Sequence, residues 1–213
     1  MGADWRRCFR FVIPVRNPNH RNHRDVLESL CSALSFLSED DYAFEFEKAT
    51  DPVPLEEYLD LSDDARAAFK ADEVVLFSGG LDSLCGAIEE LSTNGKRVAL
   101  VSHRSSSKNF DPQVQLVAEL KRRFPNKVMH VPVLLTKQEA LRVREYTQRS
   151  RAFLYAALAC VVARLFEHYR VRFFENGVVS TNLPISAQVV GACATRTTHP
   201  LASESACAAR RRS

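Results

Sequence analysis

Residues 73–83 of this chain read EVVLFSGGLDS, and this stretch decides the fold. Its opening run, EVVLF, is compact and apolar, which is typical of a buried strand. Two glycines follow, and a helical pattern begins near Asp82. A strand, a glycine turn and a helix in this order predict an α/β domain.

The alternation continues toward the C-terminus. Further strands are predicted at residues 98–102, 128–133 and 171–174, and further helices at 112–124 and 152–169. The last helix is apolar almost all round, so we expect it to be buried. The series predicts a parallel sheet with helices on both faces. Ligands of such sheets bind beyond the carboxyl ends of the strands, so the site is expected in the turns after Phe77, Ser102, Val133 and Phe174.

The chain divides by pattern into three parts. Residues 1–70 are predicted to form an N-terminal α+β extension of unknown role, with strands at 8–15 and 43–46, a helix at 23–37 and an acidic helical stretch to about residue 70. Residues 71–200 form the main α/β domain. Residues 201–213 combine small residues with three arginines and are predicted to be a disordered tail.

Composition excludes several classes of protein. The chain has 213 residues, of which 46% are hydrophobic, and its net charge of +3 is too small to predict direct binding to nucleic acid. It lacks a run of about 18 apolar residues and a signal-peptide pattern, so we expect no membrane association. The six cysteines are scattered without a CxxC pair, which favours reduced thiols and a cytoplasmic location.

The glycine turn has the chemistry of a phosphate-binding loop. Glycines let the backbone approach a ligand, and the first N–H groups of the following helix have no partner within it. Serine hydroxyls can donate to phosphate, and an aspartate in the first turn can cap the helix or hold Mg²⁺. The predicted loop consists of Ser78, Gly79, Gly80, Leu81, Asp82 and Ser83.

Two other phosphate-binding loops are excluded, because the chain has neither GxxxxGK[ST] nor GxGxxG. The remaining functional interpretation is a cradle for pyrophosphate. The structural alternative is a tight strand-to-helix turn capped by Asp82 and Ser83.

SGGLDS after a strand resembles the signature of the PP-loop ATP pyrophosphatases. QRSRAFLYAALA, residues 148–159, resembles the GRN-x-x-FL-x-x-A segment of their 7-cyano-7-deazaguanine synthase (QueC-like) branch. ENGVVSTNLP and TRTTHP look most like the QueC-like component of the Qat anti-phage systems. The resemblance covers about residues 73–200. It implies an adenine nucleotide alpha-hydrolase-like fold, ATP and Mg²⁺ as cofactors, and adenylation of a carboxylate with release of pyrophosphate.

The resemblance also implies roles for residues outside the loop. Asp82 and Arg149 would be catalytic, with Arg149 stabilising the negative charge of the transition state. Backbone groups at Ser102 and His103 would hold the adenine ring. Lys108, in the serine-rich segment RSSSKN, could reach the phosphates. The alternatives are a solvated arginine, an exposed loop histidine and a solvated loop.

Five residues are candidates for binding the acceptor substrate: Arg151, Glu175, Asn176, Asn182 and His199. Glu175 and Asn176 follow the fourth predicted strand, where a carboxylate could bind a substrate amine or Mg²⁺, although ENG could also be only a turn. Asn182 would shape the acceptor pocket. His199 belongs to the TRTTHP segment, and a single histidine can equally be structural.

The chain departs from the synthases in three respects. The synthases carry four zinc-binding cysteines near the C-terminus, whereas this chain has only Cys193 and Cys207 there, so we predict no zinc site. The Tyr-Pro-Asp segment that recognises the deazapurine is missing. The family also continues beyond the THP segment, which suggests a shortened form here. Adenylation is therefore better supported than nitrile synthesis.

Three functions remain as hypotheses. The first is an adenylating, ligase-like enzyme that acts on a small-molecule acceptor, such as a deazaguanine precursor, or on a modified partner in a defence system. The second is a nucleotide-binding subunit that docks on partner proteins of a defence operon. The third is a PP-loop sulfurtransferase acting on tRNA, which needs a reactive cysteine. Cys85 is expected to pack within its helix, which disfavours that function. The sequence does not indicate the oligomeric state.

Overall fold

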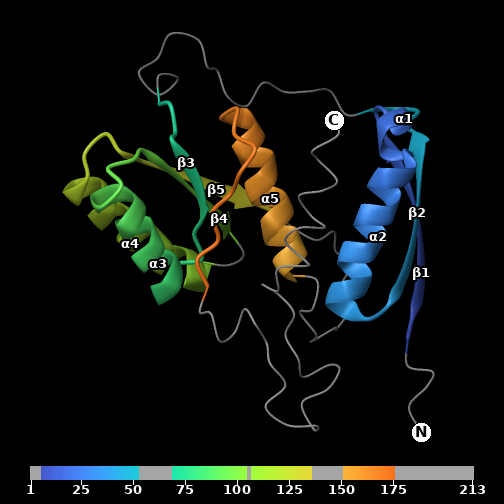
Figure 1. Cartoon of the computed structure of the whole chain (residues 1–213), viewed down its shortest axis with the longest axis horizontal. Coiled ribbons are helices and arrows are strands. Elements are labelled where there is room, and N and C mark those ends of the chain that lie inside the picture. The colour runs from blue at the N-terminus through green and yellow to red at the C-terminus, as the bar shows by residue number, and fades with distance from the viewer. Residues whose placement is uncertain (1–5, 53–68, 105–106, 136–150, 176–213) are drawn as a thin grey trace, which may run out of the picture. The chain divides into compact units, whose positions relative to one another are not determined.

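The computed structural model describes residues 6–52, 69–104, 107–135 and 151–175 (Figure 1). The side chains of residues 107–109 and 151–152 are outside this description. The described residues belong to two compact units. The first unit holds residues 6–52 and 151–153, and the second holds residues 69–104, 107–135 and 154–175.

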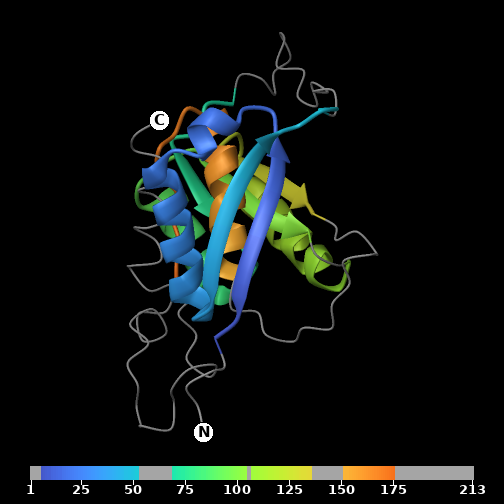
Figure 2. The same ribbon diagram turned by 90° about the vertical axis from the view of Figure 1, so that its right-hand side faces the viewer.

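The first unit consists of two parallel strands joined by helices. Its elements are β1 (Cys8–Val15), α1 (Pro18–Arg21), α2 (Arg24–Ser38) and β2 (Asp41–Lys48). Cys8 lies opposite Asp41 and Val15 opposite Lys48, and Figure 2 shows the two strands running side by side. The extension is therefore a βαβ unit, and β2 is longer than the strand predicted at 43–46. The acidic helical stretch was predicted mainly over residues 53–68, which lie outside the described residues.

A buried carboxylate forms an ion pair where the two strands of this unit begin. The side chain of Asp40, just before β2, is fully buried and binds the guanidinium of Arg7, just before β1. Arg7 Nη2 donates to Asp40 Oδ2 at 2.7 Å, and Arg7 Nε donates to Oδ1 at 3.1 Å. The side-chain hydrogen bonds from Arg7 lower the pKa of Asp40 below its ordinary value.

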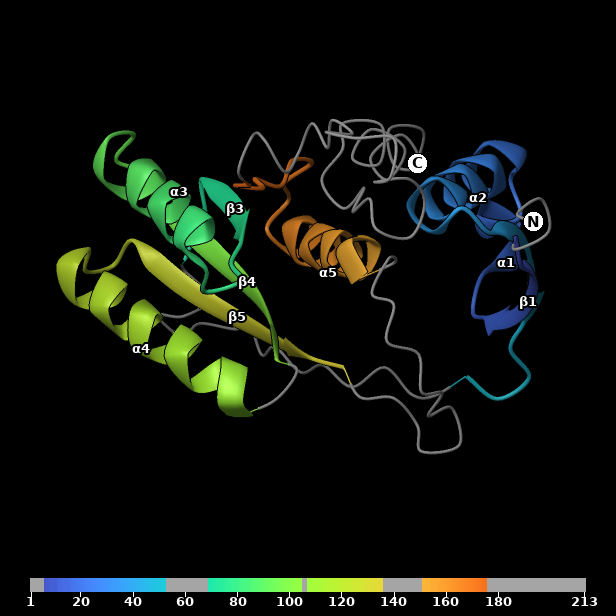
Figure 3. The same ribbon diagram turned by 90° about the horizontal axis from the view of Figure 1, so that it is seen from below.

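The second unit contains the parallel sheet that the sequence predicts. Its elements are β3 (Glu73–Leu76), α3 (Leu81–Ser92), β4 (Val98–Arg104), α4 (Ser107–Arg123), β5 (Val128–Leu134) and α5 (Arg151–Leu165). The strands pair in the order β3-β4-β5, all in parallel. Figure 3 shows α3 and α4 on one side of these strands and α5 on the other. The predicted α/β class, with helices on both faces of a parallel sheet, is confirmed.

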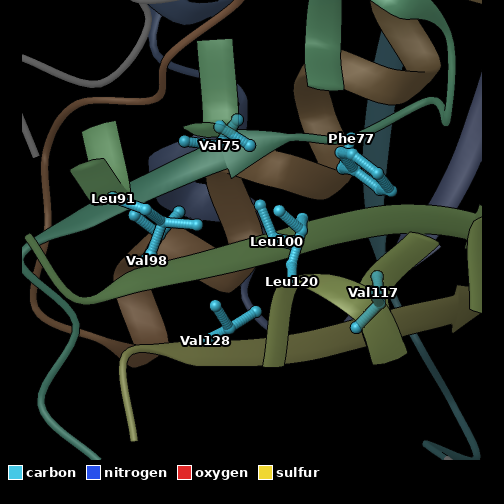
Figure 4. Close-up of a cluster of buried hydrophobic side chains, with 9 residues drawn as sticks. Val75, Phe77, Leu91, Val98, Leu100, Val117, Leu120 and Val128 are labelled. Atoms are coloured by element: carbon cyan, nitrogen blue, oxygen red, sulfur yellow. The ribbon is translucent and has the colours of Figure 1, made fainter. Parts of the chain in front are cut away.

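Two hydrophobic clusters fill the spaces between these layers. One cluster lies between the sheet and helices α3 and α4, and residues from both layers form it: Val75, Phe77, Ala87, Leu91, Val98, Leu100, Val117, Leu120 and Val128 (Figure 4). The other cluster lies between the opposite face of the sheet and α5, and it consists of Ala71, Val74, Ala99, Val101, Ala159, Val162 and Ala163. Successive strand residues face opposite sides, so the unbroken apolar run VALV in β4 serves both clusters.

The fourth predicted strand, residues 171–174, is only a single bridge beside β3. Arg172 N donates to Val74 O at 2.8 Å, and Leu76 N donates to Arg172 O at 3.0 Å. Val171 packs on the α5 side of the sheet and Phe174 on the α3 side. The apolar pattern that predicted a strand therefore reflects packing on two faces, while the ladder of hydrogen bonds is limited to Arg172.

The position of this bridge creates a topological switch point. From β3 the chain adds β4 and then β5 on one side, and it returns after α5 to the opposite side of β3. The connections that follow β3 and precede the bridge lie on opposite faces of the sheet. In open α/β sheets, the crevice at such a point, beyond the carboxyl ends of the strands, is where ligands bind. The residues after Phe77 and after Phe174 flank this point.

Two helices differ from the prediction. α4 begins at Ser107 rather than at residue 112, and Pro112 lies inside it, although proline usually marks the first turn. α5 ends at Leu165 rather than at residue 169. The expectation that α5 is buried all round is wrong, because only one side of it faces the sheet and Val161 and Leu165 are more than half exposed. Among the described helices, none combines the length and apolar character needed to cross a bilayer.

Candidate functional site

The glycine turn after β3 has a backbone that only glycine adopts easily. Phe77 N still donates to Val101 O at 2.8 Å, so the chain leaves the sheet after Phe77. Gly79 then has φ of 81°. A Cβ at Gly79 would lie 2.8 Å from Cγ of Gln113, which is too close for carbon atoms. Both the conformation and the close approach require glycine at this position.

The N-terminus of α3 has no side-chain cap. Gly80 is the N-cap residue in an extended conformation, and its carbonyl accepts the first helical bond, from Leu84 N at 3.0 Å. The N–H groups of Leu81, Asp82 and Ser83 have no such partner within the helix. The structural alternative is therefore wrong in one respect, because neither Asp82 nor Ser83 caps the helix, whereas the tight strand-to-helix turn itself is present. The side chains of Leu81 and Asp82 are exposed.

The two serines of the loop are hydrogen-bonded to each other. Ser83 Oγ donates to Gly80 O at 2.9 Å and lies 3.2 Å from Ser78 Oγ. Because a hydroxyl has a single hydrogen, Ser78 is the donor in the second bond. Gly80 N in turn donates to Ser78 Oγ at 3.3 Å. Ser83 is buried and Ser78 is exposed, so Ser78 carries the hydroxyl that a ligand can reach. To donate to a ligand, this hydroxyl would have to turn its single hydrogen away from Ser83.

Polar side chains of β4 and α4 donate hydrogen bonds to the backbone carbonyls of Phe77 and Ser78, at the start of the loop. Ser102 Oγ, on β4, donates to Phe77 O at 2.8 Å and lies 3.1 Å from His130 Nε2 on β5. Gln113 Nε2, on α4, donates to Ser78 O at 2.7 Å. That the backbone of Ser102 binds adenine remains a prediction. The side chain of Ser102 is fully buried and stabilises the loop through its hydrogen bond to Phe77 O. Burial lowers the pKa of His130, and the charge of Lys121 adds to this effect.

Gln113 was not predicted as a site residue. A sequence signal did exist, because Gln113 precedes Val117 by four residues and Leu120 by seven, and both are core residues of α4. A polar residue in an apolar helical stripe indicates either an edge of the stripe or a specific buried role. The sequence alone does not separate these two cases.

The structure brings Glu175 and Asp82 together. The pKa of Glu175 is raised, first by partial burial of its carboxyl group and then by the negative charge of Asp82. Phe174, the residue before Glu175, packs against Gly86, which is one helical turn after Asp82 on α3. Two carboxylates from distant parts of the chain are thus carried by segments that pack against each other beside the glycine loop.

His103 is not the exposed loop histidine considered as an alternative. It lies at the end of β4, and its ring centroid is 5.5 Å from that of Tyr155 on α5. Both ring nitrogens are buried, and neither has a hydrogen-bond partner among the described residues. Buried polar atoms normally have a partner, so this ring is the kind of group that a bound molecule would satisfy.

Several predicted site residues lie outside the described residues. These are Arg149, Asn176, Asn182 and His199, together with Cys193 and Cys207, which entered the prediction that zinc is absent. Lys108 lies in the first turn of α4 and Arg151 is the first residue of α5, but their side chains lie outside the part of the chain that the structure describes. The roles of all these residues remain predictions.

Cys85 differs from the expectation. It was expected to pack within α3, but it is exposed, because Gly86, Ala87 and Glu90 are the residues that α3 turns inward. Among the residues that the structure describes, no group of three or more metal-binding side chains is found. The exposed thiol therefore has no neighbouring metal-binding cluster in this part of the chain.

The chain was compared with protein-family models, with curated proteins and with solved structures, and none of them matches. What this protein binds must therefore be inferred from the glycine loop and the residues around it.

Proposed function

We propose that this protein binds ATP through its phosphates at the glycine loop and activates a carboxylate acceptor by adenylation, as the resemblance to PP-loop ATP pyrophosphatases implies. One observation carries the proposal. The uncapped N-terminus of α3 follows a glycine with positive φ at the topological switch point of a parallel sheet. Free N–H groups and the helix dipole at such a point favour a bound anion.

The described loop supports phosphate as that anion. It presents backbone N–H groups and the exposed hydroxyl of Ser78, and it has no bulky side chain before Leu81. Hydrogen bonds from neutral donors to a charged phosphate are stronger than those between neutral groups. The loop contains no lysine, so the backbone must supply much of the recognition.

Asp82 and Glu175 fit the chemistry that Mg²⁺ requires. Carboxylate oxygens are preferred ligands of Mg²⁺, and these two lie close enough that Asp82 raises the pKa of Glu175. A divalent cation between two carboxylates would relieve their repulsion. When bound with ATP, Mg²⁺ neutralises part of the charge of the phosphate chain.

The proposed reaction needs positioning and charge stabilisation rather than a nucleophilic side chain. An oxygen of the acceptor carboxylate forms a bond to the α-phosphorus of ATP, and the bond between that phosphorus and the bridging oxygen breaks. Pyrophosphate leaves, and the loop N–H groups stabilise the charge that builds up on it. Arg149 is a further proposed source of positive charge. A 7-deazaguanine precursor as acceptor, and a role in anti-phage defence, are proposals that rest on the resemblance alone.

The test is release of AMP and pyrophosphate from ATP and Mg²⁺, measured with 7-carboxy-7-deazaguanine and without an acceptor. Three proteins are compared: the wild type, Asp82→Ala, and the control Glu89→Ala, which changes an exposed residue of the same helix outside the loop. Circular dichroism verifies that all three are folded.

We expect acceptor-dependent AMP formation that Asp82→Ala abolishes and Glu89→Ala retains. ATP binding without AMP under any condition would reject catalysis and favour the alternative of a nucleotide-binding subunit. If the wild type does not bind ATP at all, the proposed function is wrong.

A further inference from the structure

The most unusual buried side chain near the glycine loop is Gln113 of α4. Its exposed fraction is 6%, and it occupies the core-facing stripe that continues with Val117 and Leu120. Burial of an amide is unfavourable unless the group is hydrogen-bonded, so an apolar residue would be expected here from packing alone. The amide must therefore have a function that an apolar side chain cannot fulfil.

The contacts of Gln113 are with the glycine loop. Its Nε2 donates to Ser78 O at 2.7 Å. Its Cγ lies where a side chain at Gly79 would begin, 2.8 Å from the ideal Cβ position. Its Oε1 is buried and has no partner among the described residues. The side chain thus supports the Ser78–Gly79 peptide directly.

Because a peptide bond is planar, the hydrogen bond from Gln113 to the Ser78 carbonyl also orients the N–H of Gly79. A trans peptide is planar, and its C=O and N–H groups point in opposite directions. The bond from Gln113 fixes the direction of the Ser78 carbonyl, so the N–H of Gly79 must point away from α4. The positive φ of Gly79 then leads the chain into Gly80 and the uncapped turn of α3.

We propose that Gln113 is a positioning residue, which fixes the Ser78–Gly79 peptide so that the Gly79 N–H is available to a phosphate anion. This inference rests on the proposed function for the identity of the anion. The support of the loop itself does not depend on it. Ser102 acts in parallel on the preceding carbonyl, that of Phe77.

Two substitutions separate orientation from space filling. Gln113→Met keeps the length and approximate volume of the side chain but removes the donor. Gln113→Glu keeps the shape, but a carboxylate cannot donate to Ser78 O. Gln115→Met and Gln115→Glu are matched controls, because Gln115 is an exposed glutamine of the same helix. Val117→Ala, a core substitution in α4, shows the effect of lost stability alone.

Two properties are measured for each variant: the dissociation constant for magnesium pyrophosphate by calorimetry, and the backbone order parameter of Gly79 in the unliganded protein by ¹⁵N relaxation. With Gln113→Met and Gln113→Glu we expect the dissociation constant to rise about tenfold or more, the change typical of one hydrogen bond to a charged group. We also expect the Gly79 order parameter to fall from about 0.85 toward 0.6. The Gln115 variants and Val117→Ala should change neither property at a temperature where they are folded.

The outcomes distinguish this inference from the proposed function. If Gln113→Met binds pyrophosphate as tightly as the wild type and Gly79 stays rigid, Gln113 only fills space and the inference is overturned, while the proposed function stands. If the wild type does not bind pyrophosphate but Gly79 becomes mobile in both Gln113 variants, the support of the loop is established and the proposed ligand is wrong. If Val117→Ala raises the dissociation constant as much as Gln113→Met, the effect is one of general stability and the inference is overturned.

Discussion

The ring of Phe174 occupies the space that a side chain at Gly86 would need, so that even a Cβ there would overlap the ring. This contact joins α3 to the segment that returns beside β3. Asp82 lies four residues before Gly86 on the same helix, and Glu175 follows Phe174 directly. The contact between a glycine and an aromatic ring therefore places the segment that carries Glu175 against the helix that carries Asp82.

Gly86→Ala should destabilise the second unit. Alanine in place of a helical glycine normally gains about 1 kcal/mol, but the displaced ring makes the substitution unfavourable by about 1–3 kcal/mol overall. Urea unfolding followed by circular dichroism measures the change. The control Cys85→Ala, at an exposed position of the same helix, should stay within about 0.5 kcal/mol of the wild type. If the loss in Gly86→Ala is not reduced by adding Phe174→Leu, the overlap with the ring is not its cause.

Asp82→Asn should lower the pKa of Glu175. The negative charge of Asp82 disfavours ionisation of Glu175, so its removal makes ionisation easier, while the larger effect of burial remains. The pKa of Glu175 should therefore fall but stay above its ordinary value. The titration of the Glu175 carboxyl carbon by ¹³C NMR measures this. Glu89→Gln removes an exposed charge of the same helix and should leave the Glu175 titration unchanged. An equal shift in that control would indicate a general charge effect.

Gly79→Ala and Gly95→Ala form a matched pair. Both glycines have positive φ, at 81° and 64°, so alanine at either position should cost about 1–2 kcal/mol in backbone strain. Nothing lies within 4 Å of a Cβ at Gly95, whereas a Cβ at Gly79 meets Gln113. Gly79→Ala should therefore lose more stability than Gly95→Ala, by about 1–3 kcal/mol, in urea unfolding. Equal losses would show that Gln113 moves aside freely.

Arg7→Ala should make the first unit sensitive to mild acid. Hydrogen bonds from Arg7 lower the pKa of Asp40 in the folded protein. The ionised carboxylate therefore stabilises the fold fully at pH values above the ordinary aspartate pKa of about 3.9. This stabilisation is lost as the pH falls through the lower pKa of the folded state. Without Arg7, burial raises the pKa of Asp40, and acid unfolding should begin at a higher pH. Circular dichroism during an acid titration measures the midpoint.

The control for Arg7→Ala is Arg10→Ala, on the same strand. Arg10 pairs with Glu45 at 2.9 Å, but both side chains are largely exposed. Its loss should change the free energy of unfolding by no more than about 1 kcal/mol and leave the acid midpoint in place. If the two variants behave alike, burial of Asp40 adds nothing to the pair.

The sequence predicts those parts of the fold that local pattern determines. The strand before Ser78, the glycine turn and the helix after it are adjacent residues, so their order follows from composition and turn chemistry. The pairing of Arg172 with β3 and the two faces of α5 depend on tertiary packing, and periodicity alone gave a full strand and a fully buried helix. The supporting role of Gln113 is equally hidden, because its partner, Ser78 O, lies 35 residues away and is a backbone atom.

In the candidate site, too, local sequence patterns predict some residues, whereas contacts between distant residues are seen only in the structure. The loop residues could be named from the sequence because the chemistry of phosphate binding selects glycine, serine and a helix N-terminus in succession. Glu175 and Asp82 were not predicted as a pair, since their proximity depends on the packing of Phe174 against Gly86. His103 was named for its place at a strand end, but only the structure shows that both nitrogens of its ring are buried without a partner among the described residues.

The switch point beside β3 has a consequence for protein synthesis. Ser78 and Glu175 lie on either side of it and are separated by about a hundred residues of chain, so a ribosome that adds roughly 5–20 residues per second needs about 5–20 seconds to translate from one to the other. During that interval the nascent chain has its glycine loop but lacks Glu175 and the ring of Phe174. Among the described parts of the candidate site, the second carboxylate and the strand segment beside β3 are synthesised last, so these parts cannot come together before Glu175 has left the ribosome.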